Sequence, residues 1–138
     1  KARIAGISPT DNPFFVTGDL NPKGFLLGDF YMVAPSKPRF RREAWFKDDY
    51  DITLQHLVTY GMVARCDRVL SSFNHANKTG GLVGVRDQEN TERAIQQLLA
   101  DYPGAVRRHA TREGEITLQW PPKKGSPLRA QMEEKGLV

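Results

Sequence analysis

The sequence predicts an α+β fold, and three observations favour it. Residues 51–61 and 87–102 carry apolar side chains at helical spacing, and each segment begins with Asp and ends near Gly or Pro. Residues 62–73 and 116–120 alternate between apolar and polar side chains, as β-strands with one solvated face do. The predicted strands and helices also alternate along the chain, which is typical of a mixed domain.

The order of these elements predicts their arrangement. Arg42–Lys47 is a candidate first strand, and it precedes the first helix and the strand after it. The short apolar run at 82–85 is a further strand, followed by the second helix and by two strands that form a hairpin around Gly114. A β-α-β-β-α-β order of this kind predicts a ferredoxin-like antiparallel sheet with both helices on one face. The other face is then open, unless an added segment covers it.

The two ends of the chain differ from the middle. Residues 1–40 are rich in Pro and Gly, and we expect an extended arm or an added hairpin that includes a strand within Phe25–Ala34. Residues 41–122 would form the ferredoxin-like domain. Residues 123–138 are a charged tail, which we expect to be mobile unless a partner holds it.

Length and composition limit the class of protein. At 138 residues the chain is long enough for one domain with its own core. No apolar run approaches the ~18 residues that span a bilayer, so we expect no membrane partner. The single cysteine, Cys66, rules out an internal disulfide and predicts an intracellular protein in which this thiol is structural. Because the chain begins at Lys1, we also expect that a targeting peptide could have been removed.

The middle of the chain resembles the RNA-recognition motif. The segments that carry this resemblance lie within residues 57–98 and read "LVTYGMVARCDRVL", "NHANKTGG", "GLVGV" and "DQENTERAIQQL". The resemblance implies a ferredoxin-like fold that binds RNA by stacking bases on aromatic side chains of the central strands. Here Gly80 and Leu82 occupy third-strand positions where the family has aromatics, and Trp45 falls on the first-strand stacking position. The implied RNA contact is therefore mainly electrostatic, with limited stacking.

A basic segment, "SKPRFRREAWFK", is the strongest candidate for that contact. Guanidinium groups bind phosphates through two hydrogen bonds, and flat aromatic rings stack on unpaired bases. A solvated strand edge with core-facing aromatics is the alternative reading of the same residues. With Trp45 as the stacking residue, the candidate backbone contacts are Lys37, Arg39, Arg41, Arg42, Lys47, Lys78, Arg107, Arg108 and Arg112.

No set of residues predicts catalysis, a metal or a cofactor. The three histidines, His56, His75 and His109, are widely separated, and one thiol cannot form a structural zinc site alone. The carboxylates of "KDDYD" are explained by the start of a helix, where the helix dipole favours negative charge. We therefore expect a protein that is not an enzyme.

The net charge of +4 and the resemblance predict an RNA-binding or ribonucleoprotein-associated domain. The alternative is a protein-interaction or assembly subunit of a larger complex, in which the arm and the tail contact neighbouring chains and the open sheet face is an interface. A third reading is a sensor that binds a small ligand at a sheet edge or a dimer interface.

Overall fold

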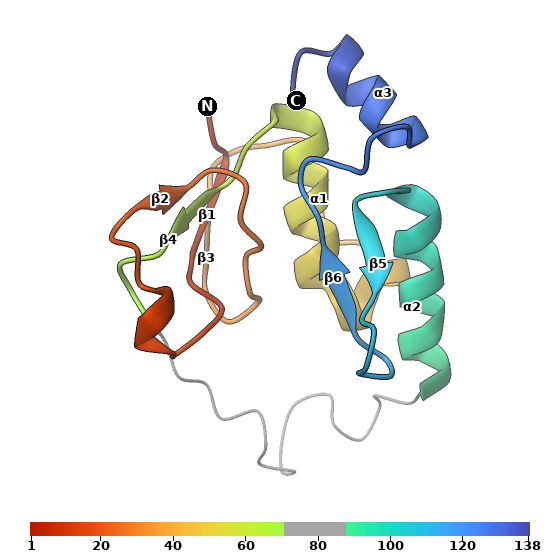
Figure 1. Ribbon diagram of the computed structural model, residues 1–138, viewed down its shortest axis with the longest axis horizontal. Coiled ribbons are helices and arrows are strands. Elements are labelled where there is room, and N and C mark those ends of the chain that lie inside the picture. Colours follow the sequence, from red (N-terminus) through yellow and green to blue (C-terminus); the bar gives the residue numbers. More distant parts are fainter. Residues whose placement is uncertain (71–87) are drawn as a thin grey trace.

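The structure, a computed structural model, describes residues 1–70 and 88–138 and confirms the α+β class. Within these residues, three α-helices accompany a four-stranded mixed sheet and a separate two-stranded hairpin (Figure 1). The elements in chain order are β1 (Ile4–Ile7), the 3-10 helix η1 (Pro13–Phe15), β2 (Leu20–Asn21), β3 (Tyr31–Val33), the 3-10 helix η2 (Arg42–Lys47), α1 (Asp48–Tyr60), β4 (Ala64–Cys66), α2 (Gln88–Asp101), β5 (Val106–Arg108), β6 (Ile116–Leu118) and α3 (Pro127–Glu134).

The four-stranded sheet has the order β2-β4-β1-β3. β1 is antiparallel to β3 and parallel to β4, and β2 is antiparallel to β4. Parallel neighbours need a long connection that crosses over the sheet. The chain between β1 and β4 includes α1, and this helix packs on one face of the sheet.

Helix α1 lies between the sheet on one side and the hairpin with α2 on the other (Figure 1). Ile52 and Leu57 of α1 pack with Ile4 of β1, Leu26 and Val63 in a core on the sheet side. Leu54 belongs instead to a second core on the hairpin side. A helix with neighbours on both sides is buried on more than one face, and in α1 the polar Asp51, Thr53 and His56 are buried beside the apolar residues. Gly61 ends it with a φ of 72°, in agreement with the predicted end.

The second core is built mainly by the C-terminal half of the chain. Residues of α2, the hairpin and α3 surround Leu54, and Leu118 and Trp120 contact both cores. The buried members of this core are Ala44, Leu54, Ile95, Leu98, Tyr102, Ala105, Val106, Ile116, Leu128 and Met132. Helix α1 therefore packs against both layers, the four-stranded sheet on one side and the hairpin with α2 and α3 on the other.

A buried carboxylate links α1 to the segment before η2 and to the end of α2. Asp51 of α1 is 1% exposed, and its Oδ2 accepts a hydrogen bond from Arg41 Nε at 2.9 Å. Gln55 Nε2 donates to Oδ2 at 2.7 Å, and the Tyr102 hydroxyl, at the end of α2, donates to Oδ1 at 2.9 Å. Arg41 also forms an ion pair with Asp101 of α2 at 2.8 Å. Asp51 is thus an internal acceptor in the first turn of α1. The predicted start of this helix at Asp51 is wrong, because α1 begins at Asp48.

The described residues do not confirm the ferredoxin-like strand order. The predicted first strand at Arg42–Lys47 is wrong, because these residues form η2 and bury Ala44 and Phe46 against their neighbours. Among the described residues, β5 and β6 pair only with each other. The predicted strand at 82–85 lies outside the described residues.

Both ends of the chain pack against the middle. Within residues 1–40, β1 is a central strand of the sheet and β3 is an edge strand. The tail, expected to be mobile, instead forms α3, whose Leu128 and Met132 are buried in the second core. Ser126 caps this helix by accepting a hydrogen bond from the Arg129 amide at 3.2 Å. The predicted division at residues 40 and 122 stays a prediction.

We predict that Asp51→Ala lowers the free energy of unfolding by about 3–5 kcal/mol, because it leaves the Tyr102 hydroxyl and part of the Arg41 guanidinium buried without an acceptor. Urea unfolding measures this. The control is Glu133→Ala, which breaks the exposed Arg129–Glu133 pair and should cost less than about 1 kcal/mol. Equal costs for the two variants would contradict a linking role for Asp51.

His56 is a buried titratable group on α1. Its Nδ1 donates to the Ile52 carbonyl at 2.8 Å, and its Nε2 is buried with no hydrogen-bond partner in the described part of the chain. Burial lowers the pKa of His56, although the Ile52 carbonyl opposes this effect. In the unfolded chain His56 binds a proton below its ordinary pKa of 6.5, whereas the folded protein keeps it neutral. Protonation of His56 therefore favours the unfolded state as the pH falls below that value.

We predict that His56→Leu reduces the loss of stability with falling pH between about pH 7.5 and pH 5. Unfolding free energies of both proteins across this range provide the measurement. Burial raises the pKa of Asp49 to about 6, which acts in the opposite direction but is common to both proteins. Parallel pH curves would show that His56 is not the group responsible.

Candidate functional site

The structure separates the predicted nucleic-acid contacts into paired and exposed side chains. Arg41 is held by Asp51 and Asp101, as described above. Lys47 is buried, with its Nζ 3.1 Å from Glu115 Oε2. These two cations are part of the internal packing, and their charge is compensated by carboxylates. Lys78 lies outside the described residues.

Lys37 and Arg39 lie on the connection between β3 and η2. The Arg39 guanidinium donates to the backbone carbonyls of Ser36, Lys37 and Pro38, the last at 2.8 Å. The backbone of Arg39 is fixed to Gln55 of α1, which donates to the Arg39 carbonyl at 2.8 Å. Arg39 thus stabilises a turn, whereas the Lys37 side chain is exposed.

Arg42 and Trp45 lie in a groove of about 890 Å³ between η2 and α2. Trp45 is 51% exposed and stacks on Phe46, with ring centroids 5.5 Å apart. Arg93 of α2 lines the same groove, and so do three carboxylates, Glu43, Glu89 and Glu92. The groove therefore has an aromatic platform with both signs of charge around it.

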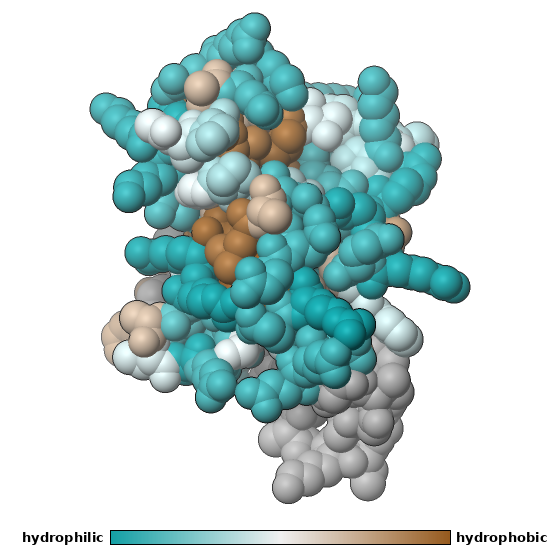
Figure 2. Space-filling view, turned by 90° about the vertical axis from the view of Figure 1, so that its right-hand side faces the viewer, coloured by the Kyte–Doolittle hydropathy of each residue, from teal (hydrophilic) through white to brown (hydrophobic). Residues whose placement is uncertain are grey.

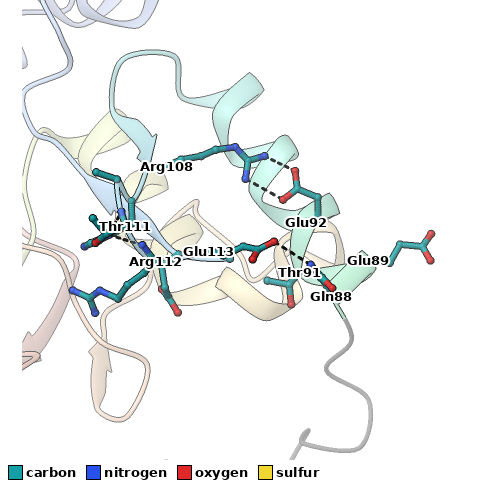
Figure 3. Close-up of a pocket in the computed structure, with 12 residues that line it drawn as sticks. Gln88, Glu89, Thr91, Glu92, Arg108, Thr111, Arg112 and Glu113 are labelled. Carbon is teal, nitrogen blue, oxygen red and sulfur yellow. Dashed lines mark hydrogen bonds and ion pairs between the residues drawn. The ribbon is translucent and has the colours of Figure 1, made fainter.

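Arg108 and Arg112 line a second groove, of about 1150 Å³, between the β5–β6 hairpin and the start of α2 (Figure 3). Arg108 points across the groove to α2, where it forms two hydrogen bonds with Glu92, one of them at 3.0 Å. Glu113 reaches Gln88 at 3.3 Å, while Arg112 points away from α2. The Arg108 pair lowers the pKa of Glu92 and raises that of Arg108. The groove is thus bridged by polar contacts within the protein.

The predicted cations within residues 1–70 and 88–138 do not gather into one basic surface. Arg107 is exposed on β5, and its Nε donates to the Thr117 hydroxyl at 3.0 Å. The side of the molecule on which α2 lies is mostly hydrophilic, with small hydrophobic areas near its middle (Figure 2). Basic and acidic side chains are interspersed in both grooves on this side.

A different surface is uniform in character, and we call it the outer sheet face. Residues opposite each other on neighbouring strands point to the same face of a sheet. The register therefore places the partners of Ala5 and Ile7 on the face opposite the buried Ile4. The members of the outer sheet face are Leu20, Cys66, Ile7, Ala64, Ala5 and Met32.

Every side chain of the outer sheet face is apolar or a thiol, and none is buried. Leu20 and Met32, at its two edges, are 67% and 65% exposed. Sequence reasoning assigned no role to Leu20 or Met32. Alternation along the strand predicts that Met32 points to the opposite face from Tyr31 and Val33. The residues that share the outer sheet face with Met32 can be identified only once the pairing of the four strands is known.

Other kinds of site find no support in the described part of the chain. Residues 1–70 and 88–138 contain no group of three or more His, Cys, Asp or Glu side chains that could hold a metal ion. Among the same residues, no helix is both long and apolar enough to cross a membrane. Comparisons of the chain with models of protein families, with curated proteins and with solved structures give no match.

We predict that Glu92→Gln increases retention on heparin, because it releases the Arg108 guanidinium into the groove. The measurement is the salt concentration at elution. Glu134→Gln, at an exposed position of α3, changes the net charge equally and is the control. Identical elution of the two variants would show that Arg108 does not contribute to a surface that binds polyanions.

Proposed function

We propose that this chain is a protein-interaction or assembly domain that binds a partner protein on its outer sheet face. The observation that supports this proposal is the composition of that face, which is apolar across all four strands. Soluble monomers rarely leave contiguous apolar patches of more than a few hundred Å² in water. A partner that covers the face would remove this apolar area from water.

The energetics favour contact through this face over contact through the cations. Burying apolar surface contributes about 25 cal/mol per Å², so Leu20 and Met32 alone offer a substantial gain on association. Phe14, 94% exposed, lines a pocket together with Leu20, and polar residues such as Asp19 and Arg65 line it as well. Arg41, Lys47 and Arg108, by contrast, already have carboxylate partners, which a phosphate would have to displace.

RNA binding is the second candidate, and Trp45 is the observation that favours it. Half of this indole is exposed beside Arg42 and Arg93, so a base could stack on it while the guanidinium groups contact phosphates. This second proposal also includes the resemblance to the RNA-recognition motif and the ferredoxin-like strand order that the resemblance implies. The carboxylates that line the same groove would weaken such binding.

We predict that a photo-reactive benzophenone amino acid at Leu20 forms covalent adducts with protein in the cells that make this chain, because Leu20 lies at the edge of the outer sheet face. The same group at Gln119, which is exposed near the hairpin, is the matched control and should form few adducts. Adducts are identified by mass spectrometry. Ile7→Lys, at the centre of the face, should reduce their yield at least about tenfold.

Equal adduct yields at Leu20 and Gln119 would contradict the proposed function. Fluorescence anisotropy with a labelled single-stranded RNA tests the second candidate. Salt-dependent binding that disappears in the double variant Arg42→Gln, Trp45→Leu would make RNA binding the better reading.

A further inference from the structure

The outer edge of β3 has backbone groups that nothing in the described residues pairs. The Ala34 amide donates to the Arg3 carbonyl at 2.9 Å, which fixes the phase of the β1–β3 ladder. Antiparallel ladders alternate between residues that bond to the neighbour and residues that point away from it. Met32 therefore bonds toward β1, whereas the N–H and C=O groups of Tyr31 and Val33 point away from the sheet.

The side chains around this edge are apolar and exposed. Met32 and Val33 within β3 are 65% and 53% exposed, and Phe30 just before it is 46% exposed. Phe40 is 58% exposed and contacts the Tyr31 ring, with centroids 6.2 Å apart. Edge strands of soluble monomers usually carry charged residues or proline that discourage further pairing. β3 itself carries neither.

We infer that a second copy of this chain pairs its β3 antiparallel with this edge, around a two-fold axis at Met32. Tyr31 of each copy would then exchange two backbone hydrogen bonds with Val33 of the other, which uses all four outward groups on each strand. The two Met32 residues would face each other on the axis. The two sheets would join into one, and their outer sheet faces would become continuous.

Charge complementarity favours a second copy as the occupant. Carboxylates gather at the beginning of β3: burial, followed by the electrostatic effect of Asp49, Asp48 and Asp29, raises the pKa of the Tyr31 hydroxyl. At the other end, Arg3 lies opposite Ala34, and Lys37 follows in the chain with an exposed side chain. Antiparallel pairing brings the acidic end of each copy toward the basic end of the other. The two-fold axis produces this contact between opposite charges twice, once at each end of the paired strands. Parallel pairing would instead place the acidic ends of the two copies side by side.

The size of the contact predicts weak association. Stable dimers bury about 800 Å² per partner, and a three-residue strand with two exposed apolar side chains, flanked by the exposed Phe30 and Phe40, offers less. We therefore expect a dissociation constant in the micromolar range, about 1–100 μM. This inference rests on the proposed function, because it names a second copy of the chain as a partner of the four-stranded sheet that carries the outer sheet face.

Disulfide trapping tests the pairing directly. In the background Cys66→Ser, the variant Met32→Cys should form covalent dimers on mild oxidation, because facing residues in a non-hydrogen-bonded pair have Cα atoms about 4.5 Å apart, within disulfide reach. Leu20→Cys is the matched control: it has nearly the same exposure and lies on the same face, at the opposite edge of the sheet. We expect at least about tenfold more covalent dimer from Met32→Cys than from this control.

Sedimentation equilibrium of the full chain gives an independent readout. The unmodified protein should dimerise with rising concentration, and Met32→Lys should weaken this at least about tenfold, whereas Leu20→Lys should not. Circular dichroism verifies that both lysine variants remain folded. A protein that stays monomeric at all concentrations and forms no more covalent dimer at position 32 than at position 20 would overturn the inference. Adducts with a different protein at Leu20 would then still support the proposed function, and their absence as well would overturn both.

Discussion

The packing of α1 against η2 and α2 depends on the Asp51 carboxylate. It lies in the first turn of α1, the helix that separates the two layers, and it accepts hydrogen bonds from Arg41 and from Tyr102 at the end of α2. Because Asp51 is almost fully buried, its negative charge requires these donors, and the donors in turn position η2 and α2. Arg41 extends the same network to Asp101. One carboxylate thus joins the first turn of α1 both to the segment just before it and to the distant end of α2.

Pairing with carboxylates also explains why the net charge is a poor guide to the positive charge that is available on the surface. The chain carries +4, yet Arg41, Lys47 and Arg108 have carboxylate partners supplied by other elements. A positive charge that is already neutralised contributes little to the attraction of a distant polyanion. The cations that remain exposed are spread over several elements and alternate with carboxylates in the grooves.

The interaction surface arises from the N-terminal part of the chain. β1 lies at the centre of the sheet, so the alternation of Ile4 and Gly6 with Ala5 and Ile7 determines which residues face α1 and which face outward. The inner face packs against α1 around Ile4, whereas the outer sheet face has no cover among the described elements. The same strand pairing leaves β3 at an edge. The outer face and the edge of one sheet thus provide both the proposed interface and the inferred site of self-association.

The sequence by itself determined the α+β class, the end of α1 at Gly61 and the β5–β6 hairpin, because helical periodicity, a left-handed glycine and alternation are local signals. Only the tertiary structure decided that Arg42–Lys47 turns into η2, that Asp51 is an internal acceptor and that the tail packs as α3. These outcomes depend on which distant side chains share a core or an ion pair. The outer sheet face has the same origin, since strand order and register are set by long-range pairing.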